Sequence, residues 1–241
     1  MVSTPSYSLV IPCYNEAGNL PALIERSREV ISRREDLEII LVDNGSTDTS
    51  PSVFAAHINK AREPRLRVCQ VEKNQGYGFG ILSGLHSAKG ESMGWTHADM
   101  QTDPDDFLEA INLYESLGCK PAYIKGKRQR GSFRDQFFTT GMTLFEYGLL
   151  GHWMDDINAQ PNLFQRSFFE SLTSPPNDFS LDLYFFFSAL DQGLPLYRFP
   201  VVFGDRLHGV GHNDKLSAKL RYSSATISYS IKLKKHLKSP R

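Results

Sequence analysis

The segment WTHADMQTDP, from Trp95 to Pro104, contains side chains that could bind a divalent cation. His97, Asp99 and Gln101 occupy alternate positions, and alternate side chains of an extended chain point the same way. The carboxylate and the amide suit Mg²⁺ or Mn²⁺, whereas the imidazole favours Mn²⁺ or heavier ions. The alternative is a polar turn that leads into a helix.

The end of this segment fits the alternative better. Asp103 precedes Pro104, and helices often start with an aspartate cap followed by a proline at the first position. We therefore assign Asp103 to capping and predict that Asp99 is a ligand.

Three further polar clusters follow apolar segments: Tyr14-Asn15-Glu16, Asp43-Asn44-Gly45-Ser46 and Lys73-Asn74. The carboxylate of Asp43 could accept hydrogen bonds from a base or a ribose, although Asp43 and Ser46 could instead cap the next helix. The glycine-rich turn NQGYGFG, which begins at Asn74, could let the backbone approach a phosphate at a helix N-terminus. It matches neither common phosphate-binding glycine pattern, so on its own it is weak evidence.

Alternating strands and helices must position these clusters. Apolar strands are predicted at 7–12, 37–42, 66–72 and 92–96, and helices at 15–31, 51–62, 81–88 and 104–117. This alternation predicts an α/β fold with a doubly wound parallel sheet, in which ligands bind beyond the carboxyl ends of the strands. The polar clusters should therefore meet at one edge of the sheet.

The second half of the chain has a less regular pattern. We expect a strand at 122–126, a helix at 133–150, an irregular stretch at 155–164, a buried helix at 179–189 and a strand at 196–203. Asp182 lies in the apolar segment FSLDLYFFF, so its carboxylate should be either paired or functional.

The composition bounds the class of protein. The 241 residues suffice for one catalytic domain and an appendage, which we place at 1–213 and 214–241. The 27 basic and 27 acidic side chains balance, so no overall charge indicates a nucleic-acid partner. The three widely spaced cysteines indicate free thiols in a reducing compartment. No segment has the roughly 18–20 apolar residues of a membrane span, and the N-terminus lacks signal-peptide features, so we expect a cytoplasmic protein.

Basic residues dominate the chain from Lys215 onward, with no acidic residue after Asp214. Apolar residues lie among them at partly helical spacing. A basic amphipathic helix over 215–241 could lie on an anionic membrane and hold the protein at the inner face of that membrane. The alternative is a terminal helix that docks on the domain.

The ordered set of motifs resembles the family 2 inverting glycosyltransferases. The motifs are SLVIPCYNEAGNL, EIILVDNGSTDTS, NQGYGFGILSGLHSAKGE and GWTHADMQTDP, roughly between Ser8 and Asp105. Within that family the chain is similar to the dolichyl- and polyprenyl-phosphate mannosyl- or glucosyltransferases, more loosely through KGKR, DDINAQPNLFQR and FGDRLHGVGH. The resemblance implies a glycosyltransferase-A fold, with a mostly parallel central sheet and helices on both faces. It also implies a nucleotide-diphosphate sugar donor and a Mg²⁺ or Mn²⁺ ion.

The resemblance further implies roles for individual residues. The residues that would hold the base and the ribose of the donor are Pro12, Tyr14, Glu16 and Asp43. His97, Asp99 and Gln101 fall on the metal motif, and the residues that would line the donor and acceptor phosphates are Arg128 and Arg206. We add Asn74, from the strand-end cluster, to the donor site.

Two positions and one segment depart from the family pattern. His97 replaces the first aspartate of the metal motif, so it could be a neutral ligand, weaken metal binding or indicate an altered donor. Asn44 replaces the second carboxylate of the usual Asp-Asp-Gly-Ser. The segment GVGH, from Gly209 to His212, replaces one that the resemblance associates with the acceptor phosphate.

The expected reaction transfers a hexose, with inversion, from a nucleotide-diphosphate sugar to a polyprenyl phosphate or a lipid-linked saccharide. Asp99, through the metal, and Arg206 would stabilise the charge of the leaving diphosphate. Asp155, Asp156 and Asp182 are candidate general bases for a hydroxyl acceptor, whereas a phosphate acceptor needs no base. Other interpretations are a soluble saccharide or protein acceptor, or a non-catalytic nucleotide-sugar-binding protein, which the departures in the two acidic motifs suggest.

Overall fold

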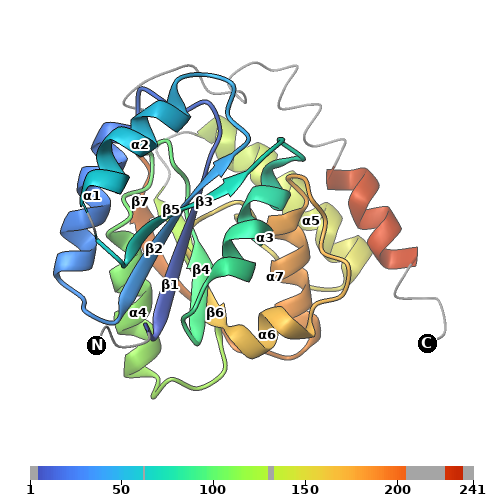
Figure 1. The fold of residues 1–241 in the computed structure, drawn as a ribbon. Coiled ribbons are helices and arrows are strands. Elements are labelled where there is room, and N and C mark those ends of the chain that lie inside the picture. The colour runs from blue at the N-terminus through green and yellow to red at the C-terminus, as the bar shows by residue number, and fades with distance from the viewer. Residues whose placement is uncertain (1–4, 62, 130–132, 205–225, 236–241) are drawn as a thin grey trace.

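Seven strands form one sheet, and helices cover both of its faces (Figure 1). The computed structural model describes residues 5–61, 63–129, 133–204 and 226–235. The strands are β1 (Tyr7–Cys13), β2 (Leu37–Asn44), β3 (Leu66–Val71), β4 (Ser92–Trp95), β5 (Tyr123–Gln129), β6 (Asn162–Gln165) and β7 (Leu196–Val202). The helices are α1 (Leu20–Ser32), α2 (Ser50–Ala61), α3 (Tyr77–Ser87), α4 (Asp106–Ser116), α5 (Phe133–Leu150), α6 (Arg166–Ser171) and α7 (Leu181–Asp191).

The strands have the order β3-β2-β1-β4-β6-β5-β7. Strands β1 to β4 are parallel, β6 runs antiparallel to both β4 and β5, and β7 is parallel to β5. Strands β5 and β7 therefore run in the same direction as the first four strands, and their carboxyl ends reach the same edge. The predicted mostly parallel sheet with helices on both faces is confirmed.

The stretch 155–164 is not irregular to its end, so that prediction was partly wrong. Its last residues belong to β6, a strand of only four residues, NLFQ. Helix α6 follows directly, has six residues and was not predicted. Both elements are too short to show a period in the sequence, and their place between longer elements is set by tertiary packing.

Strand β2 shows why the sheet is buried on both faces, because all eight of its residues are buried. Leu37, Ile39 and Leu41 face the side covered by α1, α2 and α4. Ile40 and Val42 face the opposite side, where α3 and α7 pack. Apolar residues on both faces are typical of parallel strands, and each fully buried Leu or Ile contributes about 1.5–3 kcal/mol.

Residues 226–235 form a helix that packs against α5 (Figure 1). The hydroxyl of Ser230 donates a hydrogen bond to the buried carboxylate of Glu146 at 2.7 Å. Tyr229 and Leu233 pack against the core on the same side of the sheet as α7. This part of the tail is therefore docked on the domain, and the rest of the tail lies outside the described residues.

Two expectations from the composition concern membranes and thiols. Among the described helices, none combines the length and the apolar character that a membrane crossing requires. The predicted free thiols are confirmed: Cys13 is buried, Cys69 is half-buried and Cys119 is exposed.

Candidate active site

The loops that follow β1 and β2 are bonded to one another at the carboxyl edge of the sheet. Cys13, the last residue of β1, lies opposite Asp43 in the register of the two strands. Asn15 takes a left-handed conformation (φ +55°), and its side-chain oxygen accepts the backbone N–H of Thr47 at 2.8 Å. The backbone N–H of Asn15 donates to the hydroxyl of Ser46 at 3.1 Å. The two strand-end clusters are therefore adjacent, as the topology predicted.

The residues predicted to hold the nucleotide lie along these two loops. Pro12 is half-buried near the end of β1, and Tyr14 exposes its ring just beyond the strand. Glu16 accepts a hydrogen bond from the side chain of Asn19. Asp43 is buried and accepts a backbone N–H of its own turn at 3.0 Å. The structure thus places all four predicted residues at the ends of β1 and β2.

Helix capping does not account for Asp43. The start of α2 is capped by Asp48, whose carboxylate accepts the backbone N–H of Ser50 at 2.9 Å. The carboxylate of Asp43 instead accepts the N–H of Ser46 and closes the turn at Gly45, where φ is +70°. Asp43 is therefore held at the sheet edge by the turn.

Asn44 has a structural reason to be an amide rather than a carboxylate. Its side-chain nitrogen donates a hydrogen bond to the backbone carbonyl of Gly76 at 2.9 Å. The side chain of Asn74 completes the link, because it donates to the carbonyl of Asn44 at 3.0 Å and accepts the N–H of Gly76 at 2.9 Å. Asn74, which was predicted to contact the donor, thus ties the loop after β3 to the end of β2 with its amide nitrogen and closes its own loop with its amide oxygen.

The glycines before and in α3 let another loop of the protein approach closely. A Cβ atom on Gly76 would lie 2.3 Å from the carbonyl oxygen of Asn177, and one on Gly78 would lie 2.6 Å from that of Pro176. The backbone N–H of Phe79 donates to the Asn177 carbonyl at 3.0 Å. This loop covers the helix N-terminus that the sequence offered as a phosphate site, so packing accounts for the glycines.

The segment after β4 is bent, so the expectation of an extended chain through Gln101 was wrong. Met100 takes a left-handed conformation (φ +59°), and the carboxylate of Asp99 accepts the N–H of Gln101 at 3.2 Å. The side chain of Gln101 donates to the carbonyl of Gly204, beyond β7, at 3.2 Å. Aspartate side chains favour such turns by bonding to nearby backbone, and here this ends the alternation that began at His97.

The predicted helix start at Asp103-Pro104 is two residues early: α4 begins at Asp106 with Asp105 at its N-cap position, and the turn before the helix is capped by Asp103. The carboxylate of Asp103 accepts the N–H of Asp105 at 2.9 Å in the turn that leads into α4. The same carboxylate pairs with Arg26 of α1 at 2.8 Å. Asp103 therefore fixes the turn and the adjoining helix.

His97 and Asp99 are the candidate metal ligands of this loop. Asp99 is buried and His97 is half-buried. The part of the chain that the structure describes contains no group of three or more His, Cys, Asp or Glu side chains placed to hold an ion. Protein sites for Mg²⁺ often supply only one or two carboxylates, and substrate phosphates and water complete them. The donor set therefore fits an ion that a bound diphosphate would complete, rather than a closed protein cage.

A stack of rings beside His97 was not predicted from the sequence. Tyr77, the first residue of α3, stacks on Phe179 with ring centres 4.7 Å apart and on His97 with ring centres 6.1 Å apart. The hydroxyl of Tyr77 accepts a hydrogen bond from Gln160 at 2.7 Å, and Gln160 also donates to Asp182 at 3.2 Å. These residues come from segments far apart in the sequence, and no local pattern links them.

Asp182 interacts with a buried lysine that was also not predicted. Lys125, on β5, is fully buried and donates to the carbonyl of Ala159 and to the side chain of Asn162 at 2.9 Å. Burial lowers the pKa of Lys125 to about 7, against the opposing effect of the Asp182 carboxylate. Burial raises the pKa of Asp182, and the charges of Lys125 and His97 oppose that shift. In the sequence, Lys125 belongs to KGKR and resembles an exposed basic residue.

Arg128 and Asp156, which were predicted for different roles, are bonded to each other. Asp156 is buried, and its carboxylate accepts the backbone N–H of Arg128 at 3.0 Å and the guanidinium Nε–H at 2.9 Å. The guanidinium also lies over the ring of Phe203, 5.3 Å from its centre. Arg206 lies outside the described residues.

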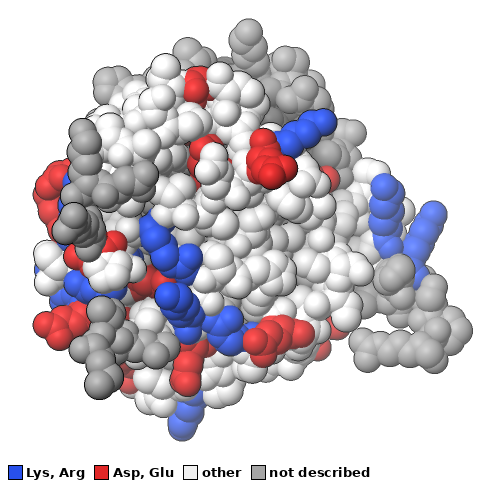
Figure 2. Space-filling view, in the orientation of Figure 1, with Lys and Arg blue, Asp and Glu red and all other residues white. Residues whose placement is uncertain are grey.

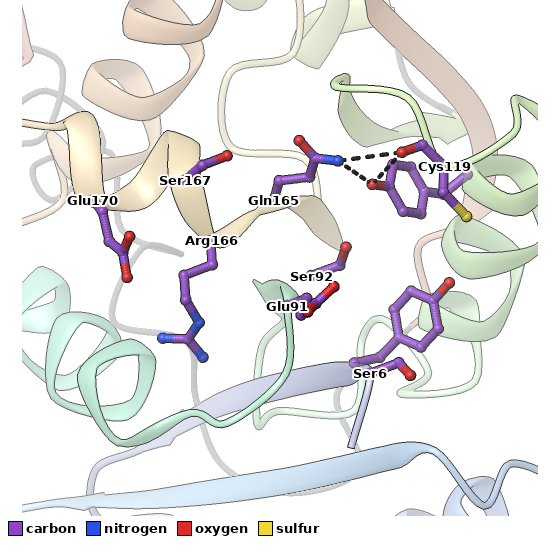
Figure 3. A pocket seen from close by; sticks show the side chains of 10 residues that line it. Ser6, Glu91, Ser92, Cys119, Gln165, Arg166, Ser167 and Glu170 are labelled. Carbon is purple, nitrogen blue, oxygen red and sulfur yellow. Dashed lines mark hydrogen bonds between the residues drawn. The ribbon is translucent and has the colours of Figure 1, made fainter. Parts of the chain in front are cut away.

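A separate cavity of about 550 Å³ lies at the opposite edge of the sheet (Figure 3). Its lining includes Ser6 and Ser92, near the amino ends of β1 and β4, and Gln165 and Arg166 at the junction of β6 and α6. Gln165 donates to the hydroxyl of Tyr114 at 2.7 Å, and Arg166 donates to backbone carbonyls. Because the lining contains none of the predicted site residues, we assign the site to the carboxyl edge.

The sequence is similar to known glycosyltransferases. The profile of Glycosyl transferase family 2 matches residues 8–171, which is more than half of the chain. An undecaprenyl-phosphate 4-deoxy-4-formamido-L-arabinose transferase from Serratia proteamaculans is 31% identical over 176 residues, 67% of this chain and 53% of that protein. The uncharacterized glycosyltransferase YkcC from Bacillus subtilis is 28% identical over 150 residues, 62% of this chain and 45% of that protein. The chain thus spans about half the length of the curated relatives it matches.

Solved structures share the fold. The mannosyltransferase PcManGT from Pyrobaculum calidifontis, in complex with GDP-Man and Mn²⁺, gives a TM-score of 0.67 at 19% identity, over 99% of this chain and 66% of that chain. Glucosyl-3-phosphoglycerate synthase from Mycobacterium tuberculosis, in complex with phosphoglyceric acid, gives a TM-score of 0.69 at 21% identity, over 94% of this chain and 80% of that chain. The predicted glycosyltransferase-A fold is confirmed. With its sequence match over 8–171, the chain belongs to glycosyltransferase family 2.

Proposed function

We propose that this protein transfers a hexose, with inversion, from a nucleotide-diphosphate sugar to a polyprenyl phosphate or a lipid-linked saccharide, assisted by Mg²⁺ or Mn²⁺. Relatives named undecaprenyl-phosphate 4-deoxy-4-formamido-L-arabinose transferases support this class of acceptor. The PcManGT complex with GDP-Man and Mn²⁺, and the synthase complex with UDP and Mn²⁺, support the donor class and the ion.

The buried carboxylates carry this proposal. Six acidic side chains are buried in the described part of the chain: Glu38, Asp43, Asp99, Glu146, Asp156 and Asp182. The four aspartates belong to segments at the carboxyl edge of the sheet, where ligands of such sheets bind. Burial of a carboxylate is unfavourable unless the group is paired or used, so this concentration indicates a site for cations and hydrogen-bond donors.

The donor nucleoside would bind along the loops after β1 and β2. The carboxylate of Asp43 can accept hydrogen bonds from a base or a ribose, and Pro12, Tyr14 and Glu16 lie beside it on the bonded loops. Arg128 is held at the carboxyl end of β5 by Asp156, a position from which a guanidinium can meet phosphate oxygens.

Negative charge grows on the diphosphate as it leaves the sugar. Asp99 and His97 would hold the divalent ion, which, when bound, neutralises part of that charge. Asp99 is buried, and its carboxylate is oriented by the N–H of Gln101. Arg206 is the second cation that the resemblance implies.

The surroundings of the three candidate bases favour a phosphate acceptor. Asp155 is paired with Lys127 and Arg198. Asp156 accepts hydrogen bonds from Arg128, and Asp182 accepts one from Gln160 in the field of Lys125. A prenyl phosphate is ionised at neutral pH and needs no base, so all three aspartates could serve to order the site. With a lipid-linked saccharide as acceptor, Asp155, Asp156 and Asp182 are the candidates to take the hydroxyl proton.

Incubation of the protein with UDP- and GDP-sugars, Mn²⁺ and a prenyl phosphate in detergent tests the proposal. We expect one donor to yield a lipid-extractable sugar phosphate whose anomeric configuration is opposite to that of the donor. Transfer to soluble saccharides alone would replace the acceptor class. Nucleotide binding without transfer to any acceptor would overturn the assignment as an enzyme.

A further inference from the structure

Large apolar side chains are exposed on and beside the outer side of α5. Leu144 is 55% exposed, Tyr147 is 51% exposed and Trp153 is 55% exposed. Phe145 on the same helix and Ile231 on the C-terminal helix are exposed as well. We call these five residues the α5 face. Groups of exposed apolar side chains mark interaction sites far more often than single ones do.

The arrangement of α5 explains why these side chains point outward. Thr143 and Glu146 are buried on the inner side, where Glu146 bonds to the C-terminal helix. Leu144 and Tyr147 are one helical turn apart on the part of the helix surface that is exposed. The ring of Trp153 packs edge-on against that of Tyr147, with centres 5.8 Å apart, and extends the face beyond the end of the helix.

Basic side chains flank the α5 face. Lys232, Lys234 and Lys235 lie on the C-terminal helix, which Lys234 fastens to α5 by donating to the carbonyl of Leu149. In Figure 2, Lys and Arg side chains stand out at the right-hand edge, where Figure 1 shows this helix. Glu146, which is buried, is the one acidic residue in the described stretches 141–154 and 226–235.

We propose that the α5 face and the lysines beside it form a docking surface for an anionic lipid bilayer. The proposal rests on the proposed function, in which the acceptor is linked to a lipid. Tryptophan and tyrosine combine an apolar ring with a polar edge and prefer the boundary between lipid and water. Apolar residues that enter this boundary beside lysines that meet anionic headgroups are typical of surface-bound helices.

The position of the α5 face suits this role. Helix α5 follows β5, whose carboxyl end carries Arg128. After Trp153 the chain returns to Asp156, which bonds to Arg128 at that end. A bilayer that receives Trp153 would therefore lie next to a segment that forms part of the candidate active site.

Tryptophan fluorescence of the full chain, measured with vesicles and without donor or metal, tests the docking surface. The chain has two tryptophans, and Trp95 is 0% exposed, so a change on adding vesicles reports on Trp153. We expect a blue shift with vesicles that contain phosphatidylglycerol, and quenching by bromine-labelled lipid tails. The variant Trp153→Phe should bind vesicles but lose the shift. An unchanged emission of the wild type would overturn the proposal.

Flotation with the same vesicles compares variants of matched size. The triple variant Leu144→Gln, Tyr147→Gln, Trp153→Gln should bind on the order of tenfold more weakly. Lys232→Gln should weaken binding about fivefold, and only with anionic vesicles. Val202→Gln, which changes an exposed apolar residue of β7, is the control and should bind like the wild type. Equal vesicle binding by the triple variant and the wild type would overturn the lipid surface. The proposal would also be overturned if the wild type were a dimer and the triple variant a monomer, with vesicle binding unchanged, because the α5 face would then be an interface between two copies of the chain.

A reaction without vesicles separates this surface from the proposed function. The triple variant should keep wild-type turnover on a water-soluble short-chain prenyl phosphate. Failure of both proteins on that acceptor, together with intact vesicle binding, would contradict the proposed function and leave the docking surface supported.

Discussion

The side-chain nitrogen of Asn44 donates a hydrogen bond to the backbone carbonyl of Gly76 at 2.9 Å. The bond ties the end of β2 to the start of α3, at a position where the resemblance leads one to expect a carboxylate. A carboxylate there would face the carbonyl oxygen with no proton to share. The amide is therefore a requirement of this fold, and it is not by itself a sign that nucleotide binding has been lost.

Replacement of Asn44 by Asp should lower the free energy of unfolding by about 1–3 kcal/mol at neutral pH, because a buried acceptor is left unpaired. Asn44→Ala, which loses the bond without adding a charge, should be less destabilised. The pKa of such a buried aspartate would be raised in the folded state, so the excess loss should shrink as the pH falls and the group takes up a proton. Urea denaturation at neutral and mildly acidic pH measures both effects, and an Asn44→Asp protein as stable as the wild type would contradict them.

Replacement of Gly78 by Ala should destabilise the protein by about 1–3 kcal/mol. The new Cβ would lie 2.6 Å from the carbonyl oxygen of Pro176 and 2.8 Å from that of Asp178, and these backbone atoms can move only if the loop shifts. Gly141→Ala is the control, since nothing lies within 4 Å of its Cβ and alanine favours a helix by up to about 1 kcal/mol. Denaturant unfolding measures both variants. An equal change in the denaturant midpoint of Gly78→Ala and Gly141→Ala would show that the close approach of the loop does not explain the glycine at position 78.

The parallel half of the fold could be predicted because its signals are local. Strands such as β2 are nearly all apolar, the helices between them are periodic, and the connection rule sends their polar ends to one edge. That reasoning correctly placed Asp43 and Asp99 at the edge. Strand β6, with four residues between β4 and β5, has no such signal, and its antiparallel pairing is fixed only by tertiary packing.

The polar groups behind the edge could not be predicted for a related reason. Tyr77, Gln160 and Asp182 are linked by hydrogen bonds between residues distant in sequence. Lys125 has basic neighbours in the sequence, a pattern typical of exposed residues, but its position on β5 places it in the interior. Burial of single polar residues depends on the assembled layers, which the sequence pattern specifies only on average.

Replacement of Lys125 by Met should flatten the pH dependence of stability between about pH 7 and pH 10. The folded pKa is about 7, whereas an unfolded lysine has a pKa of about 10.4, so between these values the unfolded chain binds the additional proton. Stability therefore rises with pH in this window, by up to about 1.4 kcal/mol per pH unit, and methionine removes that contribution.

Denaturant unfolding across this pH range measures the slope. Lys127→Met is the control, because Lys127 lies on the same strand with its side chain exposed and should leave the slope unchanged. A slope that persists in Lys125→Met would show that another group is responsible.

The most direct test of the assigned active site measures the melting temperature of the wild type and of Asp99→Ala. Nucleoside diphosphates are added to each protein with and without Mn²⁺. The wild type should be stabilised by one nucleotide in a Mn²⁺-dependent way. Asp99→Ala should remain folded, lose the Mn²⁺-dependent stabilisation by nucleotide and lose sugar transfer. Asp103→Ala is the control, since loss of a cap should reduce stability by about 1 kcal/mol and leave nucleotide binding intact. Near-normal Mn²⁺-dependent turnover by Asp99→Ala would contradict the site described here.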